Sequence, residues 1–435
     1  GLVVSLYCGA ASALLVLVKD RVLASLFIWG SGSLSQQGWD SSVALLWRLG
    51  IMVVPLVLLL RPLSLLDLGD DSVRALGLSV TRLRLAAIGI AAALSSFVTS
   101  AVGVIGFVGL VAPVIAGLSG ARRFGDRLLW STVIGALLLL LTDATLQILA
   151  GATSEFVPTG AVTAVIGSPL LLLLLPRLKA ATPPHSVGPG NRGAAVSVRA
   201  AAVMAVAMFV LLGALAILVG RAPSGEWQIL SIDQLDQLLT WRLPRIVAAA
   251  SAGALLGTAG LILQRLTGNE MASPEVLGVS AGAILAVALS LFVFGTLGGV
   301  SEGLAAIVGG GPVLVMILGS RSSFAPERVL LAGIALSSLI DAVVGVLSAT
   351  GDPRAIILLG WMSGSTGGTR GSDAVAAGVT AAVLVAISLL AVRWLAILPL
   401  GGPQAKALGL SIGRSRFLLL LLAAVLTAAA TPVIG

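Results

Sequence analysis

The residues of this chain that are best placed to do chemistry lie in a polar stretch that occurs twice. Residues 63–84 (LSLLDLGDDSVRALGLSVTRLR) and 395–416 (LAILPLGGPQAKALGLSIGRSR) align at an offset of 332, and 11 of the 22 positions are identical. Glycine permits tight turns between short helices, apolar side chains can pack into a partner's groove, and charges at the rim of such a contact steer association. The pattern therefore indicates a repeated docking loop. An ordinary basic loop, which would only fix membrane topology, is the alternative.

The same offset holds outside the loop. The sequence WGSGS, from Trp29 to Ser33, falls on WMSGS, from Trp361 to Ser365. The chain is therefore one unit that occurs twice.

Other polar side chains stand alone within or beside apolar segments. Within the segments they are Gln264, Asp341, Asp143 and Gln147. Polar groups inside a membrane usually face a cavity or a partner helix, so they either line a pathway or form a hydrogen bond between helices.

Catalytic and metal-binding motifs are not found in the sequence. None of the three lysines, Lys19, Lys179 and Lys406, follows a glycine, so there is no Walker A motif, and neither H-E-x-x-H nor G-x-S-x-G occurs. The single cysteine, Cys8, excludes an internal disulfide and a cysteine metal cluster. The lone His185 argues against a histidine metal site. We expect a protein that is not an enzyme and binds no cofactor or metal.

The elements that hold these residues must be membrane helices. Hydrophobic residues make up 58% of the chain and charged residues 10%, against about 25% charged in soluble domains, and the mean hydropathy is +1.10. Several apolar runs approach the roughly 20 residues that a spanning helix needs, and backbone groups in lipid must be satisfied within a helix. The net charge of +8 is better explained by basic cytoplasmic loops than by nucleic-acid binding, because no basic stripe with interleaved aromatics occurs.

We predict about 13 membrane segments in two groups. The first six lie at about 1–18, 43–60, 85–106, 107–119, 128–150 and 161–176, with the fourth too short to span alone. The other seven lie at about 200–220, 246–265, 277–296, 302–319, 329–349, 374–393 and 417–435. Residues 180–199 between the groups are rich in Pro, Gly and charge and are expected to form a linker. The predicted domains are thus 1–179 and 200–435.

The distribution of basic residues predicts the orientation. Placing the linker in the cytoplasm puts 18 of the 26 Lys and Arg residues on the inside. Both polar loops then face the cytoplasm, so the repeat is parallel rather than inverted. The offset further predicts that the first unit would begin about 130 residues before Gly1 and the second would extend roughly 75 residues beyond Gly435.

Residues 241–283 (WRLPRIVAAASAGALLGTAGLILQRLTGNEMASPEVLGVSAGA) resemble the FecCD-type permeases, the membrane subunits of ABC importers for iron-siderophores, haem and cobalamin. The family pattern is RLPR, a Gly/Ala-rich helix ending in Gln, and N-P-L-A-x-P-x-x-L-G-V-S-x-G-A. The positions that match its second part are Gln264, Asn269, Ala272, Pro274, Leu277, Gly278, Val279, Ser280, Gly282 and Ala283. Glu270 stands where the family has Pro, Val114 where it often has His, and Gln147 where it often has Arg.

Residues 103–113 and 158–169 resemble later segments of the same family, so the resemblance covers essentially the whole chain. It implies an all-α polytopic fold of two parallel tandem ten-helix repeats of the type II (BtuC-like) class. It implies the C-terminal part of a first permease unit, followed by the N-terminal part of a second. Two fused units resemble the ferric-hydroxamate permeases of the family.

The resemblance assigns the repeated loop to coupling with an ATPase subunit. The family pattern is roughly L-x-L-G-E-x-x-A-x-x-L-G, and its matches here are Gly69, Asp70, Asp71, Arg74, Leu76 and Gly77, then Gly401, Lys406, Leu408 and Gly409. In the second copy Gly402 replaces the acid. Two copies of the loop imply two ATPase subunits, which would use the ATP.

Two further sites follow from the resemblance. Arg242 and Arg245 of the RLPR motif would contact acidic residues of a periplasmic siderophore-binding protein, whereas snorkelling at the membrane interface is the alternative. The expected pathway residues are Trp29, Ser31, Gln264, Asn269, Ser280, Trp361 and Ser363. Trp29 and Trp361 are also explained by the preference of Trp for membrane interfaces.

The predicted function is a permease that imports an iron-siderophore, with ferric hydroxamate favoured by the fusion, across the bacterial inner membrane with a separate ATPase. Haem and cobalamin remain open as substrates. A secondary transporter driven by an ion gradient is the alternative from another class, although such carriers usually show inverted repeats or buried carboxylates. A purely structural membrane protein is a third possibility.

Overall fold

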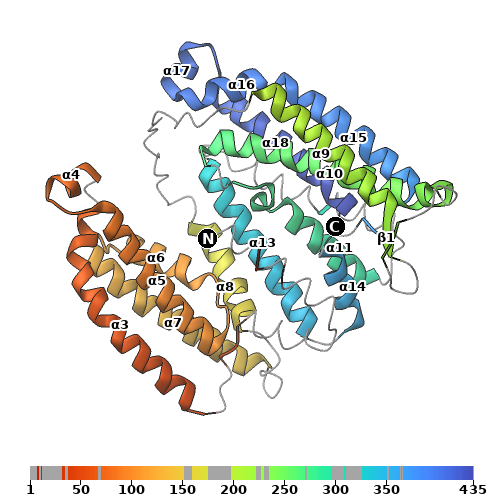
Figure 1. Ribbon diagram of the computed structural model, residues 1–435. Coiled ribbons are helices and arrows are strands. Elements are labelled where there is room, and N and C mark those ends of the chain that lie inside the picture. The colour runs from red at the N-terminus through yellow and green to blue at the C-terminus, as the bar shows by residue number, and fades with distance from the viewer. Residues whose placement is uncertain are drawn as a thin grey trace. The chain divides into compact units, whose positions relative to one another are not determined.

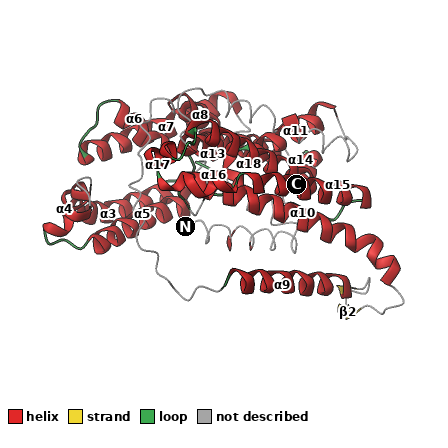
Figure 2. Cartoon of the chain, turned by 90° about the horizontal axis from the view of Figure 1, so that it is seen from above, coloured by secondary structure: helices red, strands yellow, loops and turns green. Residues whose placement is uncertain are grey.

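The protein is nearly all helical (Figures 1 and 2). The computed structural model describes residues 7–8, 11, 32–34, 38–66, 70–150, 159–174, 197–221, 227–229, 235–269, 272–294, 308–309, 326–349, 352–362, 364 and 366–434. The first helices are α3 (Asp40–Leu65), α4 (Asp70–Ala75), α5 (Val80–Val102), α6 (Val108–Leu118), α7 (Phe124–Ala150), α8 (Thr159–Leu174) and α9 (Val198–Leu218). Then come β1 (Val219–Arg221), β2 (Trp227–Ile229), α10 (Leu235–Thr267), η6 (Pro274–Leu277), α11 (Val279–Phe294), α13 (Pro326–Ala349) and α14 (Pro353–Met362). The last are α15 (Gly371–Leu390), α16 (Val392–Ile397), η7 (Leu398–Leu400), α17 (Gly402–Ala407) and α18 (Ile412–Ile434).

Within the described residues, six helices are long and apolar enough to cross a membrane: Asp40–Leu65, Val80–Val102, Phe124–Ile148, Arg242–Thr267, Gly371–Leu390 and Ile412–Val433. Five shorter apolar helices are Val108–Leu118, Thr159–Leu174, Val203–Leu218, Val279–Val293 and Leu331–Leu347. These eleven helices fall on eleven of the predicted segments, so the prediction of a polytopic helical membrane protein is confirmed. The predicted segments at 1–18 and 302–319 and nearly all of the linker lie outside the described residues.

Two elements were not anticipated. One is the antiparallel ribbon of β1 and β2, in which Val219 pairs with Ile229 and Arg221 with Trp227. The other is helix α14, which is only ten residues long. Both are too short to give a periodic hydrophobic signal in the sequence.

The chain divides into two compact units. Unit 1 contains residues 1–178 and 334–356, and unit 2 contains residues 179–333 and 357–435. Residues 334–356 lie in the second sequence repeat, yet they pack within unit 1.

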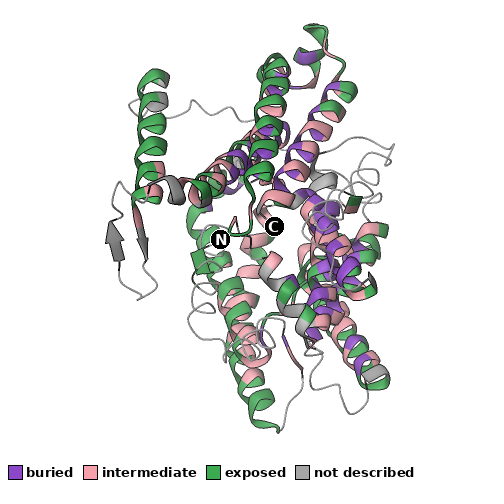
Figure 3. Cartoon of the chain, turned by 90° about the vertical axis from the view of Figure 1, so that its right-hand side faces the viewer, coloured by how far each residue is buried: buried purple, intermediate pink, exposed green. Residues whose placement is uncertain are grey.

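Unit 1 is built from helices that follow one another in the chain. Helix α3 packs against α5 and α7, and α6 packs against α7 and α8. Its buried core joins Phe107 and Val111 to Leu171 of α8 and Ala342 of α13. No residue of α3 is buried, and more than half of the residues of α3 and of α5 are exposed. Figure 3 colours the described chain by burial.

Unit 2 is organised around α10, which packs against both α15 and α18. Gly378 of α15 allows close approach, because a Cβ there would lie 3.5 Å from Val247 Cγ1 and 3.9 Å from Ser251 Oγ. Two residues before Val247 in α10, Arg245 donates from Nη2 to the carbonyl of Gly367, which precedes α15, at 2.9 Å. The two contacts advance in the same direction along both helices, so α10 and α15 run parallel.

Candidate functional site

The two copies of the polar loop fold in the same way. Each begins with a six-residue helix, α4 at Asp70–Ala75 and α17 at Gly402–Ala407, and these occupy the same positions at the offset of 332. Helix α4 packs against α5 and α17 against α18, and each forms the end of its helical hairpin (Figure 1).

The hydrogen bonds that end the first short helix recur in the second. In the first copy the Gly77 amide donates to the Arg74 carbonyl at 2.9 Å and the Leu78 amide to the Val73 carbonyl at 3.2 Å. The corresponding second-copy bonds join Gly409 to Lys406 at 2.9 Å and Leu410 to Ala405 at 3.0 Å. This pair of bonds is the Schellman motif, which satisfies the free carbonyls at the end of a helix.

The glycine in each turn has a conformational reason. The Schellman motif requires a left-handed residue after the helix, and φ is +76° at Gly77 and +81° at Gly409. Residues with a side chain lose about 1–2 kcal/mol of stability in this left-handed conformation. The two glycines, which the sequence identified from identity alone, therefore hold the turn of each loop.

Each loop has a buried base and an exposed tip. Val73 is 0% exposed and its counterpart Ala405 is 1% exposed, so both anchor the short helix to its unit. Leu76 and Leu408 are exposed. Arg74 and Lys406, the basic residues at corresponding positions of the two loops, are also exposed. An apolar tip with a basic residue beside it, on a rigid turn, is suited to docking in a groove of another protein.

Sequence reasoning missed the two anchors. Val73 and Ala405 differ in type, so identity between the copies did not mark them. The hydrophobic contact that often accompanies a Schellman motif, from the residue after the glycine back to the helix, could have found them.

The two copies differ at the start of the short helix. The first begins with Asp70 and Asp71, whereas the second has Pro403 in its first turn. Acidic residues favour a helix N-terminus through its dipole, and Pro favours it through its fixed φ. Gly401 precedes the second helix with a φ of +104°. The corresponding Gly69 and the side chains of Asp70 and Asp71 lie outside the part that the structure describes.

Arg242, a residue of α10, contacts the C-terminal end of helix α9. Its Nη1 donates to the carbonyls of Ala216 at 3.1 Å, Ile217 at 2.7 Å and Val219 at 2.9 Å. These carbonyls belong to the last turn of α9 and the residue after it, which lack partners within the helix. Arg242 therefore caps α9, whereas Arg245 is exposed and reaches Gly367. The sequence did not predict this capping contact, because only the tertiary structure brings Arg242 to the end of α9.

Four of the seven predicted pathway residues lie within the described part of the chain, on or beside α10, α11 and α14. Gln264 and Asn269 are exposed near the end of α10, and Ser280 is half-buried in the first turn of α11. Trp361 is half-buried in α14, and its carbonyl accepts a hydrogen bond from the Gly364 amide at 3.1 Å. Trp29, Ser31 and Ser363 lie outside the described residues.

Two of the isolated polar residues pair with each other. Gln147 Nε2 donates to Asp143 Oδ2 at 2.7 Å, one turn apart on the exposed side of α7. The spacing of four residues could have predicted this bond from the sequence. The structure thus gives these two side chains a local partner within one helix.

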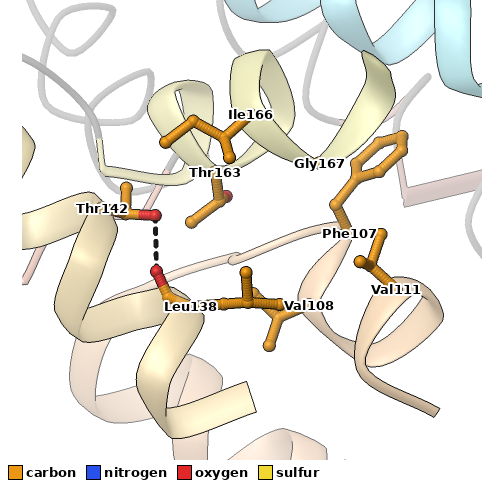
Figure 4. A pocket seen from close by; sticks show the side chains of 8 residues that line it. All are labelled: Phe107, Val108, Val111, Leu138, Thr142, Thr163, Ile166 and Gly167. Atoms are coloured by element: carbon orange, nitrogen blue, oxygen red, sulfur yellow. Dashed lines mark hydrogen bonds between the residues drawn. The ribbon is translucent and has the colours of Figure 1, made fainter. Parts of the chain in front are cut away.

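A small cavity in unit 1 lies between α6, α7 and α8 (Figure 4). Its volume is about 10 Å³, which is room for about one water molecule. It is lined by Phe107, Val108, Val111, Leu138, Thr142, Thr163, Ile166 and Gly167. The Thr142 hydroxyl donates to the Leu138 carbonyl at 2.8 Å, and Thr163 donates to Gly160 at 2.7 Å. The cavity is too small for a metal chelate. Among the described residues, no three His, Cys, Asp or Glu side chains are grouped to hold a metal ion.

The apolar helices place this chain in the class of multi-pass membrane proteins. The sequence matches the FecCD transport family over residues 1–177 and 205–435. The chain belongs to the FecCD transport family.

Named relatives are similar over different shares of the chain. The iron(3+)-hydroxamate import system permease protein FhuB of Salmonella typhimurium is 46% identical over 446 residues, covering 100% of this chain and 64% of the relative. FhuB of Escherichia coli is 45% identical over 445 residues, covering 100% of this chain and 66% of the relative. The vitamin B12 import system permease protein BtuC of Vibrio cholerae is 33% identical over 246 residues, covering 53% of this chain and 70% of the relative. The chain thus spans slightly less than two thirds of the length of the two FhuB proteins.

Proposed function

We propose that this chain is the permease of an ABC importer that carries ferric hydroxamate across the bacterial inner membrane. The observation that supports this most directly is the identity of 46% to an iron(3+)-hydroxamate permease over the whole of this chain. In this proposal the chain has two permease units, at 1–179 and 200–435, joined by a cytoplasmic linker. It binds no cofactor and has no ATPase site of its own, and a partner subunit hydrolyses the ATP.

The two loops are the proposed contacts for two ATPase subunits. Their support is the matching turn at Gly77 and Gly409 together with exposed leucines at Leu76 and Leu408. Closure of the ATPase dimer would move the short helices and, through their packing on α5 and α18, the membrane helices.

The contacts within unit 2 bear on the relative direction of two helices, whereas the basic residues bear on which end is cytoplasmic. If both loops face the cytoplasm, α10 and α15 both run from the outside to the inside in the predicted topology, and therefore parallel. The contacts of Arg245 with Gly367 and of Val247 with Gly378 agree with that arrangement. Arg245 is exposed at the outer end of α10 and is the better candidate of the two RLPR arginines for contact with a periplasmic binding protein.

Growth and uptake measurements test the proposal. We expect the chain, expressed with its ATPase subunit in a strain lacking hydroxamate, haem and cobalamin permeases, to restore uptake of ⁵⁵Fe-labelled ferric hydroxamate. Restored uptake of haem or labelled cobalamin instead would assign it another substrate of the family. Uptake that continues without the ATPase subunit and stops when the ion gradient collapses would establish a secondary transporter.

A further inference from the structure

An apolar groove in unit 2 lies beside the second polar loop. It has a volume of about 410 Å³, within the range of about 300–1,000 Å³ that is common for small-molecule sites. Its lining comes from the end of α15, from α16 and from the first half of α18, and consists of Leu384, Ile387, Leu390, Ala391, Trp394, Leu418, Leu419, Leu421, Leu422 and Val425. All ten side chains are apolar or aromatic, which suits a hydrocarbon chain.

The groove follows the end of α15 and crosses the break at Ala391 into α16. From Leu384 to Leu390 the rise along α15 is about 9 Å, and the hydrocarbon core of a bilayer is about 30 Å thick. Trp394 lines the end of the groove nearest to the loop, and Trp prefers the boundary between hydrocarbon and headgroups. The groove therefore extends from a headgroup region toward the middle of the membrane.

Two basic residues lie close in sequence to the residues that line that same end. Arg393 is next to Trp394, and Arg414 precedes Leu418 by one turn on the same face of α18. Both arginines are exposed. Beyond Asp373 the chain has four basic residues and no acidic one, and the element η6, which packs against α18, contributes the exposed Glu275.

The first repeat lacks both features. Pro62 stands where the second repeat has Trp394, and residues 59–84 hold three acidic residues among four basic ones. If the only role of the basic residues were to fix the membrane topology, both loops would need them. That role does not explain why acidic residues are missing from the second loop.

The first repeat offers a comparison for one position on this face. Leu58 is the counterpart of Leu390. It is 72% exposed, although the first unit continues after α5 with α6, α7 and α8, and α7 packs against α3. Leu390 itself is 82% exposed. A side chain exposed at this depth of a membrane helix meets lipid.

We propose that the groove binds one anionic phospholipid, with an acyl chain along α15 and α18 and the phosphate headgroup at Arg393 and Arg414. The leaflet is the cytoplasmic one if the orientation proposed above holds. The site itself does not depend on what the protein transports. Such a lipid would lie against the membrane helices that flank the second loop.

Native mass spectrometry of the full chain in a non-ionic detergent tests the site. The probes are phosphatidylglycerol and phosphatidylcholine with the same acyl chains. We expect one phosphatidylglycerol to bind with clear preference, and Arg393→Gln/Arg414→Gln to weaken that binding about 30-fold, from the usual attraction per basic residue. The matched control is Arg61→Gln/Arg82→Gln, which removes the counterparts of the same two arginines in the first repeat, and it should change the binding less than twofold.

A groove-filling variant separates the chain from the headgroup. Leu418→Trp should reduce binding of both lipids while leaving the arginines in place. Equal binding of the two lipids, equal losses in the two double variants, or unchanged binding in Leu418→Trp would each overturn the proposal.

Discussion

Alanine at the two loop glycines is the sharpest test of the coupling turns. Gly77 and Gly409 have φ of +76° and +81°. A Cβ added at either position would meet nothing within 4 Å. The substitution therefore introduces no clash, and its whole cost comes from the left-handed backbone.

That cost is about 1–2 kcal/mol at each loop, which corresponds to a roughly 5- to 30-fold change in an equilibrium. The bonds at risk are those from Gly77 to Arg74 and from Leu78 to Val73, with their counterparts in the second copy. Because the turn is on the surface and the spanning helices are untouched, we expect Gly77→Ala/Gly409→Ala to insert normally. The chain then leaves each short helix without a fixed direction. We therefore expect movement of the ATPase subunits to be transmitted less efficiently to the membrane helices.

Proteoliposomes with the ATPase subunit and binding protein provide the assay. We expect ferric-hydroxamate uptake per ATP hydrolysed to fall about 5-fold or more in the double alanine variant, and less in either single variant. Asparagine adopts the left-handed conformation more readily than other residues, so Gly77→Asn/Gly409→Asn should recover much of the coupling. Gly413→Ala is the matched control, because this glycine lies within α18 with open space around it.

Two outcomes would refute the reasoning. One is uptake per ATP in the double alanine variant that equals that of the unmodified protein. The other is an asparagine variant as impaired as the alanine variant, since that would show that the left-handed turn is not what the glycines supply.

Three further substitutions test individual contacts. Arg242→Gln removes a charged donor from the end of α9 and should lower stability by about 1.5–3 kcal/mol; an unchanged melting temperature with weaker binding-protein affinity would favour docking instead. Gln147→Leu removes an exposed bond worth about 0.2–0.5 kcal/mol, so stability and uptake should both be retained, and lost uptake would restore its pathway role. Gly278→Ala combines a φ of +73° with a Cβ only 3.1 Å from Gly333 and should cost about 2–5 kcal/mol. Gly268→Ala, with a φ of +65° and open space, should cost only about 1–2 kcal/mol, and equal melting temperatures for these two variants would contradict the packing argument.

Local sequence information was sufficient for the loops and for the helices. The turn at Gly77 depends on residues within six positions of one another, so its repetition at Gly409 could be predicted by alignment of the chain with itself. The long apolar runs likewise predicted the spanning helices, because in lipid the backbone has few alternatives.

Tertiary contacts could not be predicted in this way. The capping of α9 by Arg242 and the contact of Arg245 with Gly367 join residues 23–26 and 122 positions apart. Nothing in the spacing of the RLPR motif distinguishes an arginine that caps a helix from one that contacts a partner. The structure separates them by burial, since Arg242 is half-buried and Arg245 exposed.

The difference between Asp70 and Gly402 takes on a new meaning with the structure. In the sequence it is a departure from the family pattern, because Gly402 stands where the pattern has an acid. Both positions are the first residue of a short helix, where an acid and a following Pro403 are alternative ways to favour the same helix start. The two copies share the turn, the buried anchor, the exposed leucine and the basic residues, and they differ in the acidic residues, which only the first copy has. Charge changes the rate of docking more than its geometry, so the two loops are expected to couple in the same way and to recruit their ATPase subunits at different rates.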